Sequence, residues 1–299
     1  MSCRPRGYAD WSPQKKAIGI VNQVKDILEE EAEYLPLTIR QIFYRLVARG
    51  VIGKDEKSYK SLCECLNKAR RASFISFDDI RDDGFSAFNW VGYNNYDQWI
   101  RTTIHCAENL ELDKQRDQKT RLVVWCEAGG MVPQLERFVK ELSIPVVSSG
   151  GFDSLSTKKV MASELSRIVT DGQDIRVLHI GDYDPSGVTI FTALAEDVSA
   201  FAKADSGVTM SFERIAVLPE HIDEYNLPTS PPKITDVRRQ FTDDRTTQCE
   251  ALKPETLKRI LLSAIHRYVD EDTFQDAVFE QREARVDAIS TLKQLGFSG

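Results

Sequence analysis

Apolar side chains recur at helical spacing in the first third of the chain, as in Ile18, Val21 and Val24. This periodicity predicts three helices and then a short strand and turn, over residues 13–33, 38–50, 57–71 and 74–84. Thr38 is typical of an N-cap, and Gly50 is typical of the residue that ends a helix. Three helices followed by a β wing indicate a winged helix-turn-helix domain, which we expect over residues 1–84.

The pattern changes at residue 121, where continuous apolar runs begin to alternate with helical segments. The predicted strands are 122–125, 144–151, 174–184 and 212–218, and the helices between them are 132–142, 156–169 and 187–202. Strands that are apolar along their whole length are typical of parallel sheets covered on both faces. We therefore expect an α/β domain with a mostly parallel sheet over residues 121–299, with C-terminal helices near 254–269 and 272–295.

The segment 85–120 connects these two domains. It is rich in aromatic residues, continues as a helix of mixed charge and ends in the polar run DKQRDQKT at 113–120. We expect this segment to pack between the domains, and its polar run is the best candidate for a linker.

Charge is unevenly distributed along the 299 residues, whose net charge is −7. Residues 38–71 carry 9 basic and 3 acidic side chains, whereas residues 121–299 carry 20 basic and 28 acidic ones. A basic segment inside an acidic chain is a candidate phosphate contact. A solvated basic face without a ligand is the alternative interpretation of the same charges.

Cysteine spacing and hydropathy exclude several classes of protein. The six cysteines form no CxxC pair, which indicates free thiols rather than a zinc ribbon or a disulfide framework. No run of eighteen apolar residues is present, and the N-terminus lacks an apolar core of signal-peptide length. We expect a cytoplasmic protein, associated with the nucleoid or present in an infected cell, and no membrane partner.

Acidic side chains follow two of the predicted strands. Glu127 comes directly after the first apolar run, and Asp182 and Asp184 follow the third within GDYDPSG. In open α/β sheets, ligands bind beyond the carboxyl ends of the strands. Oxygen ligands without histidine or cysteine suit Mg²⁺, so these carboxylates are a candidate magnesium site. Acidic residues are also common in turns, and a turn that binds no metal is the alternative.

Two motifs in the same order resemble a known family, the topoisomerase VI A subunit and its eukaryotic relative, the meiotic double-strand-break protein. A strand that ends in Glu, followed two strands later by one that ends in DxDPxG, is the pattern of the Toprim domain. The stretch at 181–187 resembles the family's form of the second motif, and the stretch at 149–159 is similar to the glycine-rich turn between the motifs. The stretch at 248–261 resembles the family's sequence after the last strand. TIRQIFYRLV at 38–47 is similar to the family's catalytic winged-helix motif. The resemblance covers roughly residues 13–270, and the chain looks most like the compact A-subunit-like proteins of bacteria, phages and mobile elements.

The resemblance implies a mechanism of DNA cleavage by transesterification. Tyr44 would attack a phosphodiester of double-stranded DNA and become linked to its 5′ phosphate, with Arg40 holding the phosphate and Glu127 contributing to catalysis. Mg²⁺ would be bound by Glu127, Asp182 and Asp184. The side chains that would contact the DNA backbone without reading its sequence are Arg45, Arg49, Lys68, Arg70 and Arg71.

The helical geometry around Tyr44 agrees with this role. At about 100° per residue, Tyr44 lies off the apolar stripe of its helix, and Arg40 lies four residues earlier on the same flank. We therefore expect the Tyr44 side chain to point away from the core and toward a phosphate.

The resemblance also implies partners. In the family, the tyrosine and the metal of one site come from different subunits, which predicts a homodimer. The chain has no GxxxxGK[ST] motif, so strand passage would need a separate ATPase subunit. Two other functions stay open: a Toprim nuclease in which water attacks, and a DNA-binding module without catalysis.

Overall fold

The computed structural model describes residues 9–81, 92–148, 155–169, 172–232 and 241–297. The end of the expected wing, at 82–84, and the start of the glycine-rich stretch at 149–159 lie outside the described residues.

A four-stranded parallel sheet forms the centre of the molecule. Its strands are β3 (Thr120–Cys126), β4 (Val146–Ser148), β5 (Asp174–Ile180) and β6 (Met210–Ala216), in the spatial order β4-β3-β5-β6. Every pair of neighbours is parallel. The α/β class and the parallel sheet flanked by helices, expected from the continuous apolar runs, are confirmed.

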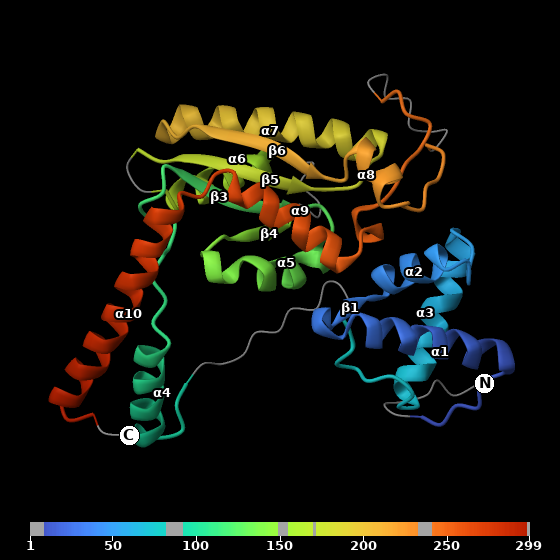
Figure 1. Cartoon of the computed structure of the whole chain (residues 1–299), viewed down its shortest axis with the longest axis horizontal. Coiled ribbons are helices and arrows are strands. Elements are labelled where there is room, and N and C mark those ends of the chain that lie inside the picture. The colour runs from blue at the N-terminus through green and yellow to red at the C-terminus, as the bar shows by residue number, and fades with distance from the viewer. Residues whose placement is uncertain (1–8, 82–91, 149–154, 170–171, 233–240, 298–299) are drawn as a thin grey trace.

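Helices cover both faces of the sheet, which makes three layers (Figure 1). One face packs on α6 (Leu155–Arg167) and α7 (Pro185–Ser206) through Val123, Trp125 and Val177. The other face packs on α5 (Val132–Val139) and α9 (Pro254–His266) through Leu122, Val124 and Leu178. Successive residues of β3 thus face opposite layers, because the side chains of a β-strand alternate between its two faces. We refer to residues 111–269 as the sheet unit, which also contains the short helix α8 (Pro219–Glu224).

The first described part of the chain, residues 9–81, folds into three helices, and we call it the helical unit. The helices are α1 (Lys15–Glu30), α2 (Ile39–Ala48) and α3 (Glu56–Arg71), close to the ranges expected from periodicity. Thr38 caps α2 as predicted, because its side chain accepts a hydrogen bond from the Gln41 amide while the Gln41 side chain accepts one from the Thr38 amide.

The two short strands of the helical unit do not pair as a wing hairpin does. β1 (Leu37–Thr38) and β2 (Ile80–Arg81) lie next to each other in a parallel arrangement. A winged helix returns through an antiparallel hairpin after its third helix, and the described residues contain no such hairpin. Three helices are therefore present, whereas the wing remains an expectation.

Helix α2 is enclosed on two sides, and this arrangement joins the two units. Its apolar stripe packs on α1 and α3, and its opposite flank lies against residues 248–252 of the sheet unit, which include the short 3-10 helix η4 (Cys249–Ala251). The buried guanidinium of Arg45 donates hydrogen bonds to the carbonyl oxygens of Glu250, Ala251 and Leu252, the last two at 2.7 Å. The buried Gln41 donates to Gln134 Oε1 of α5 at 2.9 Å. The buried apolar side chains of the two units also form one continuous core.

The polar run at 113–120 is partly buried within the sheet unit, although its composition is typical of a linker. Gln115 is buried, and its side-chain amide donates to the carbonyls of Leu122 and Ser143. Gln173 donates to the carbonyls of Gln115 and Gln118 at 2.6 Å. Side-chain amides thus satisfy buried backbone groups, and this role produces the same polar composition as a solvated linker.

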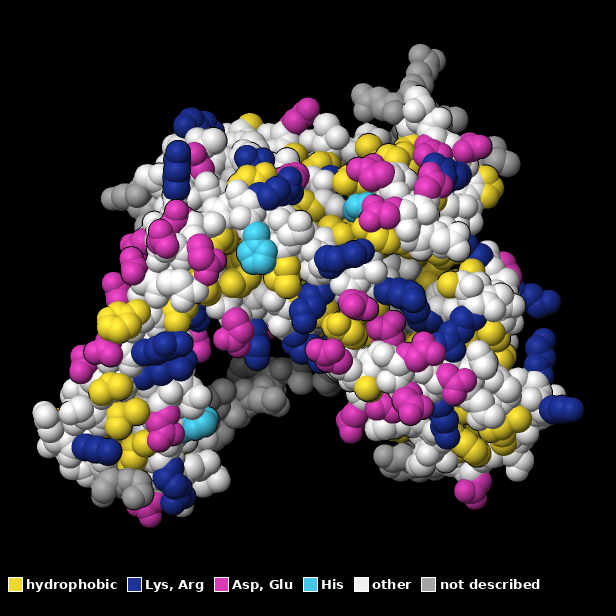
Figure 2. Space-filling view, viewed as in Figure 1, with side chains coloured by type: hydrophobic (Ala, Val, Ile, Leu, Met, Phe, Trp, Pro, Cys, Tyr) yellow, Lys and Arg dark blue, Asp and Glu magenta, His cyan; other side chains and the backbone are white. Residues whose placement is uncertain are grey.

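Helices α4 (Tyr96–Glu108) and α10 (Glu271–Gln294) lie side by side and project away from the sheet unit as an arm (Figure 1). Phe279 and Val286 are exposed on the arm, where Figure 2 shows apolar side chains between charged ones. None of the helices in the described part of the chain has the length and apolar character needed to cross a bilayer.

We expect Arg45→Met to destabilise the protein by about 2–4 kcal/mol, because three buried carbonyl groups would lose their charged donor. Urea unfolding of the two proteins measures the difference. Arg49→Met, which removes a surface ion pair with Glu30, is the matched control and should change the free energy of unfolding by less than about 1 kcal/mol. Equal effects of the two substitutions would contradict the role given to Arg45.

Candidate functional site

The acidic residues lie where β3 and β5 end side by side. The two strands pair from Thr120 to Cys126, and the Glu127 amide continues the ladder by donating to the Ile180 carbonyl at 2.8 Å. The Asp182 amide donates to Glu127 Oε2 at 3.1 Å. The structure therefore brings Glu127 next to the aspartate motif, as expected for neighbouring strands.

The two aspartates of the motif bind different parts of the chain. Asp184 is the N-cap of α7, and its Oδ1 accepts a hydrogen bond from the Gly187 amide at 2.6 Å. Asp182 Oδ1 accepts one from the Cys249 amide at 2.9 Å. Although they are two residues apart, the two carboxylates therefore face different neighbours.

Gly187 leaves room for two of the three carboxylates. A Cβ atom at this position would lie 3.3 Å from Glu127 Oε2, 3.4 Å from Asp184 Oδ1 and 2.6 Å from the Asp182 carbonyl oxygen. The glycine thus allows the Glu127 and Asp184 side chains to approach the same point. A Cβ at Gly181 would lie 2.7 Å from Glu127 Oε2, so this glycine also gives the glutamate its space.

The three carboxylates do not form one ligand set. Among the described residues, no three Asp, Glu, His or Cys side chains lie close enough together to hold a metal ion. Glu127 and Asp184 approach the same point beside Gly187, and their sharing of a metal site with Asp182 stays a prediction. Asp182 differs because the Cys249 amide holds its carboxylate on the side of the helical unit. The side-chain oxygen atoms near Gly187 are carboxylate oxygens, the ligand type that Mg²⁺ prefers in proteins.

Burial raises the pKa of the Glu127 carboxyl to about 7, and the negative charge of Asp182 adds to this effect. Burial also raises the pKa of the Asp182 carboxyl. The positive charge of Arg214 in β6 lowers the pKa of Glu127 and so opposes this increase. Hydrogen bonds to the backbone carbonyls of Gly181 and Asp182 hold the Arg214 guanidinium in place. Burial of neighbouring acids is sufficient to raise their pKa values in this way.

Tyr44 lies beside this acidic group rather than in solvent. Its hydroxyl donates a hydrogen bond to Gln248 Oε1, and Gln248 is adjacent to the Cys249 amide that binds Asp182. The side chain is 5% exposed, so the expectation that it points away from the core was wrong. The helical-wheel argument counted only contacts within the helical unit, whereas residues 248–252 cover the other flank of α2. Burial, and then Asp182, raise the pKa of the Tyr44 hydroxyl well above its usual range.

Two cationic side chains flank Tyr44. Arg40 is half exposed, and its Nε lies 3.6 Å from Glu250 Oε2. Lys54 Nζ lies 5.8 Å from the centre of the Tyr44 ring and donates to the Pro228 carbonyl at 3.0 Å. Arg40 was expected near Tyr44, and the structure places it there.

The sequence reasoning missed four residues of the site: Lys54, Arg214, Gln248 and Glu250. Arg214 stands within FERIAVL, the mostly apolar run of the edge strand β6, and this was a signal because a charged residue in such a run needs a partner. Gln248 and Glu250 lie in the stretch at 248–261, which the resemblance already singled out. Nothing in the local sequence indicates that Lys54 reaches Tyr44.

The proposed DNA contacts separate into buried and exposed residues. Arg45 and Arg70 are 8% and 7% exposed, and Arg70 donates to the Ile80 carbonyl, so neither is placed to bind a phosphate. Arg49 forms an ion pair with Glu30. Lys68 is exposed, and Arg71 is partly exposed with its Nε bound to Asn67. The expectation is thus corrected for Arg45 and Arg70, because arginine side chains that follow an apolar stripe were counted as surface charge.

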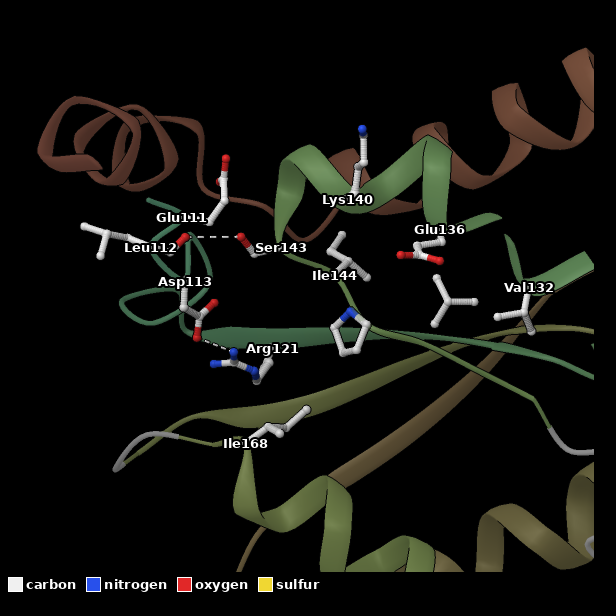
Figure 3. A pocket seen from close by; sticks show the side chains of 12 residues that line it. Glu111, Leu112, Asp113, Arg121, Val132, Glu136, Lys140, Ser143, Ile144 and Ile168 are labelled. Carbon is white, nitrogen blue, oxygen red and sulfur yellow. Dashed lines mark hydrogen bonds and ion pairs between the residues drawn. The ribbon is translucent and has the colours of Figure 1, made fainter. Parts of the chain in front are cut away.

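A separate pocket lies at the other end of the strands, where β3 and β4 begin (Figure 3). It is lined by the start of β3, the start of β4 and α5, and Arg121 in its wall pairs with Asp113. Glu127 lies six positions after Arg121 along the extended chain, which is roughly 20 Å. This pocket is therefore distinct from the acidic group.

Comparison of the chain with models of protein families, with curated proteins and with solved structures finds no match.

We expect the free energy of unfolding of the metal-free protein to fall as pH rises from about 4.5 to about 7, relative to Glu127→Gln. The folded pKa of Glu127 lies above its unfolded value, so the folded state binds the extra proton in this window and loses that advantage above it. Because the side chain is partly exposed, the difference should be about 1–2 kcal/mol.

Urea unfolding in a chelator at stepped pH measures this difference. Glu136→Gln, at an exposed glutamate of α5, is the matched control and should keep the wild-type pH profile. Parallel profiles for Glu127→Gln and the wild type would show that the raised pKa is wrong.

Proposed function

We propose that this protein cuts DNA in a Mg²⁺-dependent transesterification, as an enzyme similar to the A subunit of topoisomerase VI, with a Toprim-type sheet unit. One observation carries the proposal: the Tyr44 hydroxyl binds Gln248, and the next residue along the chain binds Asp182. The Tyr44 hydroxyl and the Asp182 carboxylate thus bind adjacent residues of one loop.

The proposed step needs no co-reactant. The Tyr44 oxygen attacks phosphorus, and a bond from oxygen to phosphorus forms as the bond from phosphorus to the 3′ oxygen breaks. The phenol proton passes to solvent, and the leaving 3′ oxygen takes up a proton from solvent. Tyr44 then carries the 5′ phosphate, and the phosphodiester energy is kept in the new bond.

The chain's own residues have separate tasks in this step. Arg40 and Lys54 would attract the phosphate because both are cations beside Tyr44, and the charge of Arg40 also favours the phenolate. Glu127 and Asp184 would hold Mg²⁺ around Gly187, with Asp182 at the border with Tyr44. The bound ion would supply charge stabilisation for the phosphate oxygens. Arg214 holds the backbone of Gly181 and Asp182 in place.

The burial of Tyr44 favours a second function, a Toprim nuclease in which water is the nucleophile. A hydroxyl that is enclosed and has a raised pKa is a poor nucleophile until its surroundings change. In this alternative, Tyr44 and Gln248 only join the two units, and the acidic group acts without a covalent intermediate.

The covalent adduct separates the two functions. When the wild-type protein is denatured during reaction with labelled supercoiled plasmid and Mg²⁺, we expect labelled DNA on the protein, and Tyr44→Phe should lower this adduct by more than about 100-fold. Tyr34→Phe is the matched control, since Tyr34 packs on Phe138 away from the acids. Cleavage that continues in Tyr44→Phe without any adduct would favour the nuclease.

DNA binding should depend on the exposed cations of α3. We expect Lys68→Ala with Arg71→Ala to reduce the slope of log affinity against log salt by roughly 1–2, since each phosphate contact contributes about 0.9 for duplex DNA. Fluorescence anisotropy at stepped salt measures the slope. Lys15→Ala with Lys16→Ala, exposed at the start of α1, is the control with the same charge change. An unchanged slope in the α3 variant would remove this surface from the interface.

A further inference from the structure

The Tyr44 hydroxyl is held by a side chain that has no part in the proposed step. We propose that its hydrogen bond to Gln248 is an autoinhibitory contact, which keeps Tyr44 inactive until a DNA phosphate replaces the Gln248 oxygen as the acceptor. This inference rests on the proposed function, because it states how the same site is restrained before its substrate binds.

The acceptor of the Tyr44 hydroxyl is a neutral oxygen atom. The hydroxyl donates to Gln248 Oε1, and the Tyr44 side chain is 5% exposed. An amide oxygen is a much weaker base than a phenolate, so it accepts the hydrogen bond without removing the proton. A buried hydroxyl without an acceptor would be unfavourable, so the contact stabilises the protonated side chain in its enclosed position. Attack on phosphorus needs the opposite state, an accessible oxygen that loses its proton.

The backbone around Gln248 is fixed, whereas the Gln248 side chain can turn. Thr247 exchanges backbone hydrogen bonds with Tyr183 at 2.8 and 3.0 Å, and the Cys249 amide donates to Asp182 Oδ1 at 2.9 Å. Thr247 and Cys249 are buried, but Gln248 between them is partly exposed. Rotation of the Gln248 side chain toward solvent therefore breaks the contact while the loop and α2 keep their places.

Two cations beside the Tyr44 ring indicate what replaces the Gln248 oxygen. Lys54 Nζ lies 5.8 Å from the centre of the ring, and the charge of the half-exposed Arg40 acts on the Tyr44 hydroxyl. Both attract an anion to the hydroxyl, whereas Gln248 offers a neutral amide. A hydrogen bond to an ionised acceptor is roughly twice as strong as one between neutral groups. The exchange of the amide oxygen for a phosphate oxygen is therefore favourable.

Acetylation of tyrosine hydroxyls with N-acetylimidazole in the absence of DNA, followed by mass mapping of the peptides, measures the contact. We expect Gln248→Ala to raise the rate at Tyr44 by about 10-fold, the order of the equilibrium constant of one buried hydrogen bond. Gln248→Glu keeps an acceptor oxygen in the same place and should keep the wild-type rate. Gln275→Ala, at an exposed glutamine of α10, is the matched control.

Adduct formation on labelled supercoiled plasmid with Mg²⁺ then measures whether the contact restrains the reaction. We expect Gln248→Ala to form the adduct about 3–10-fold faster than the wild-type protein, because the phosphate no longer competes with the amide. Gln248→Glu should form it more slowly, because its carboxylate repels the phosphate. A faster reaction cannot result from a folding defect, and Gln248→Asn, whose shorter side chain withdraws the oxygen, repeats the measurement if Gln248→Ala does not fold.

The wild-type protein distinguishes a failure of this inference from a failure of the proposed function. If the wild-type protein forms the adduct, an unchanged acetylation rate at Tyr44 in folded Gln248→Ala overturns the autoinhibitory contact. Slower adduct formation by this folded variant overturns it as well, since Gln248 would then assist the reaction. If neither the wild-type protein nor any variant forms the adduct, the proposed function is overturned and the autoinhibitory role with it.

Discussion

The buried guanidinium of Arg45 is the constraint on which the arrangement of the two units depends. A charged group enclosed in a protein must be surrounded by acceptors, and the three carbonyls of residues 250–252 are the acceptors here. These carbonyls are fixed only when the loop before α9 is in place, and the loop in turn binds Asp182 through its Cys249 amide. The position of α2, the path of the loop and the direction of one acidic side chain are thus parts of a single set of polar contacts.

The acidic group depends on a balance between repulsion and enclosure. Glu127 and Asp182 are drawn together by the parallel pairing of β3 and β5, and burial penalises both charges. Arg214 compensates in part, yet its guanidinium is directed at backbone carbonyls rather than at the carboxylates. The residual negative charge is the property on which the proposed binding of a cation depends.

The sequence predicted those features that depend on local pattern. Continuous apolar runs predicted the strands of the sheet, and Thr38 predicted the start of α2. The acidic residues directly after β3 and β5 were predicted to lie close together. Features that depend on contacts distant in sequence could not be read from a pattern. Tyr44 and Arg45 lie on a flank of α2 that is amphipathic within its own unit, and the loop that covers them is more than 200 residues away. The run at 113–120 has the composition of a linker because side-chain amides serve buried backbone groups and solvent equally well.

The register of β3 against β5 has a consequence for how this chain tolerates insertions. Thr120 pairs with Asp174 and Cys126 with Ile180 without interruption. The two strands therefore end at the same level, and this places Glu127 beside the residues that follow β5. One extra residue in β5 would turn every later side chain of that strand to the opposite face, whereas two extra residues would restore the face and displace Asp182 along the strand by about 6–7 Å. Insertions and deletions should therefore be tolerated in the loops that precede the strands, at the end of the sheet away from the acidic group, while the strands themselves keep a constant number of residues.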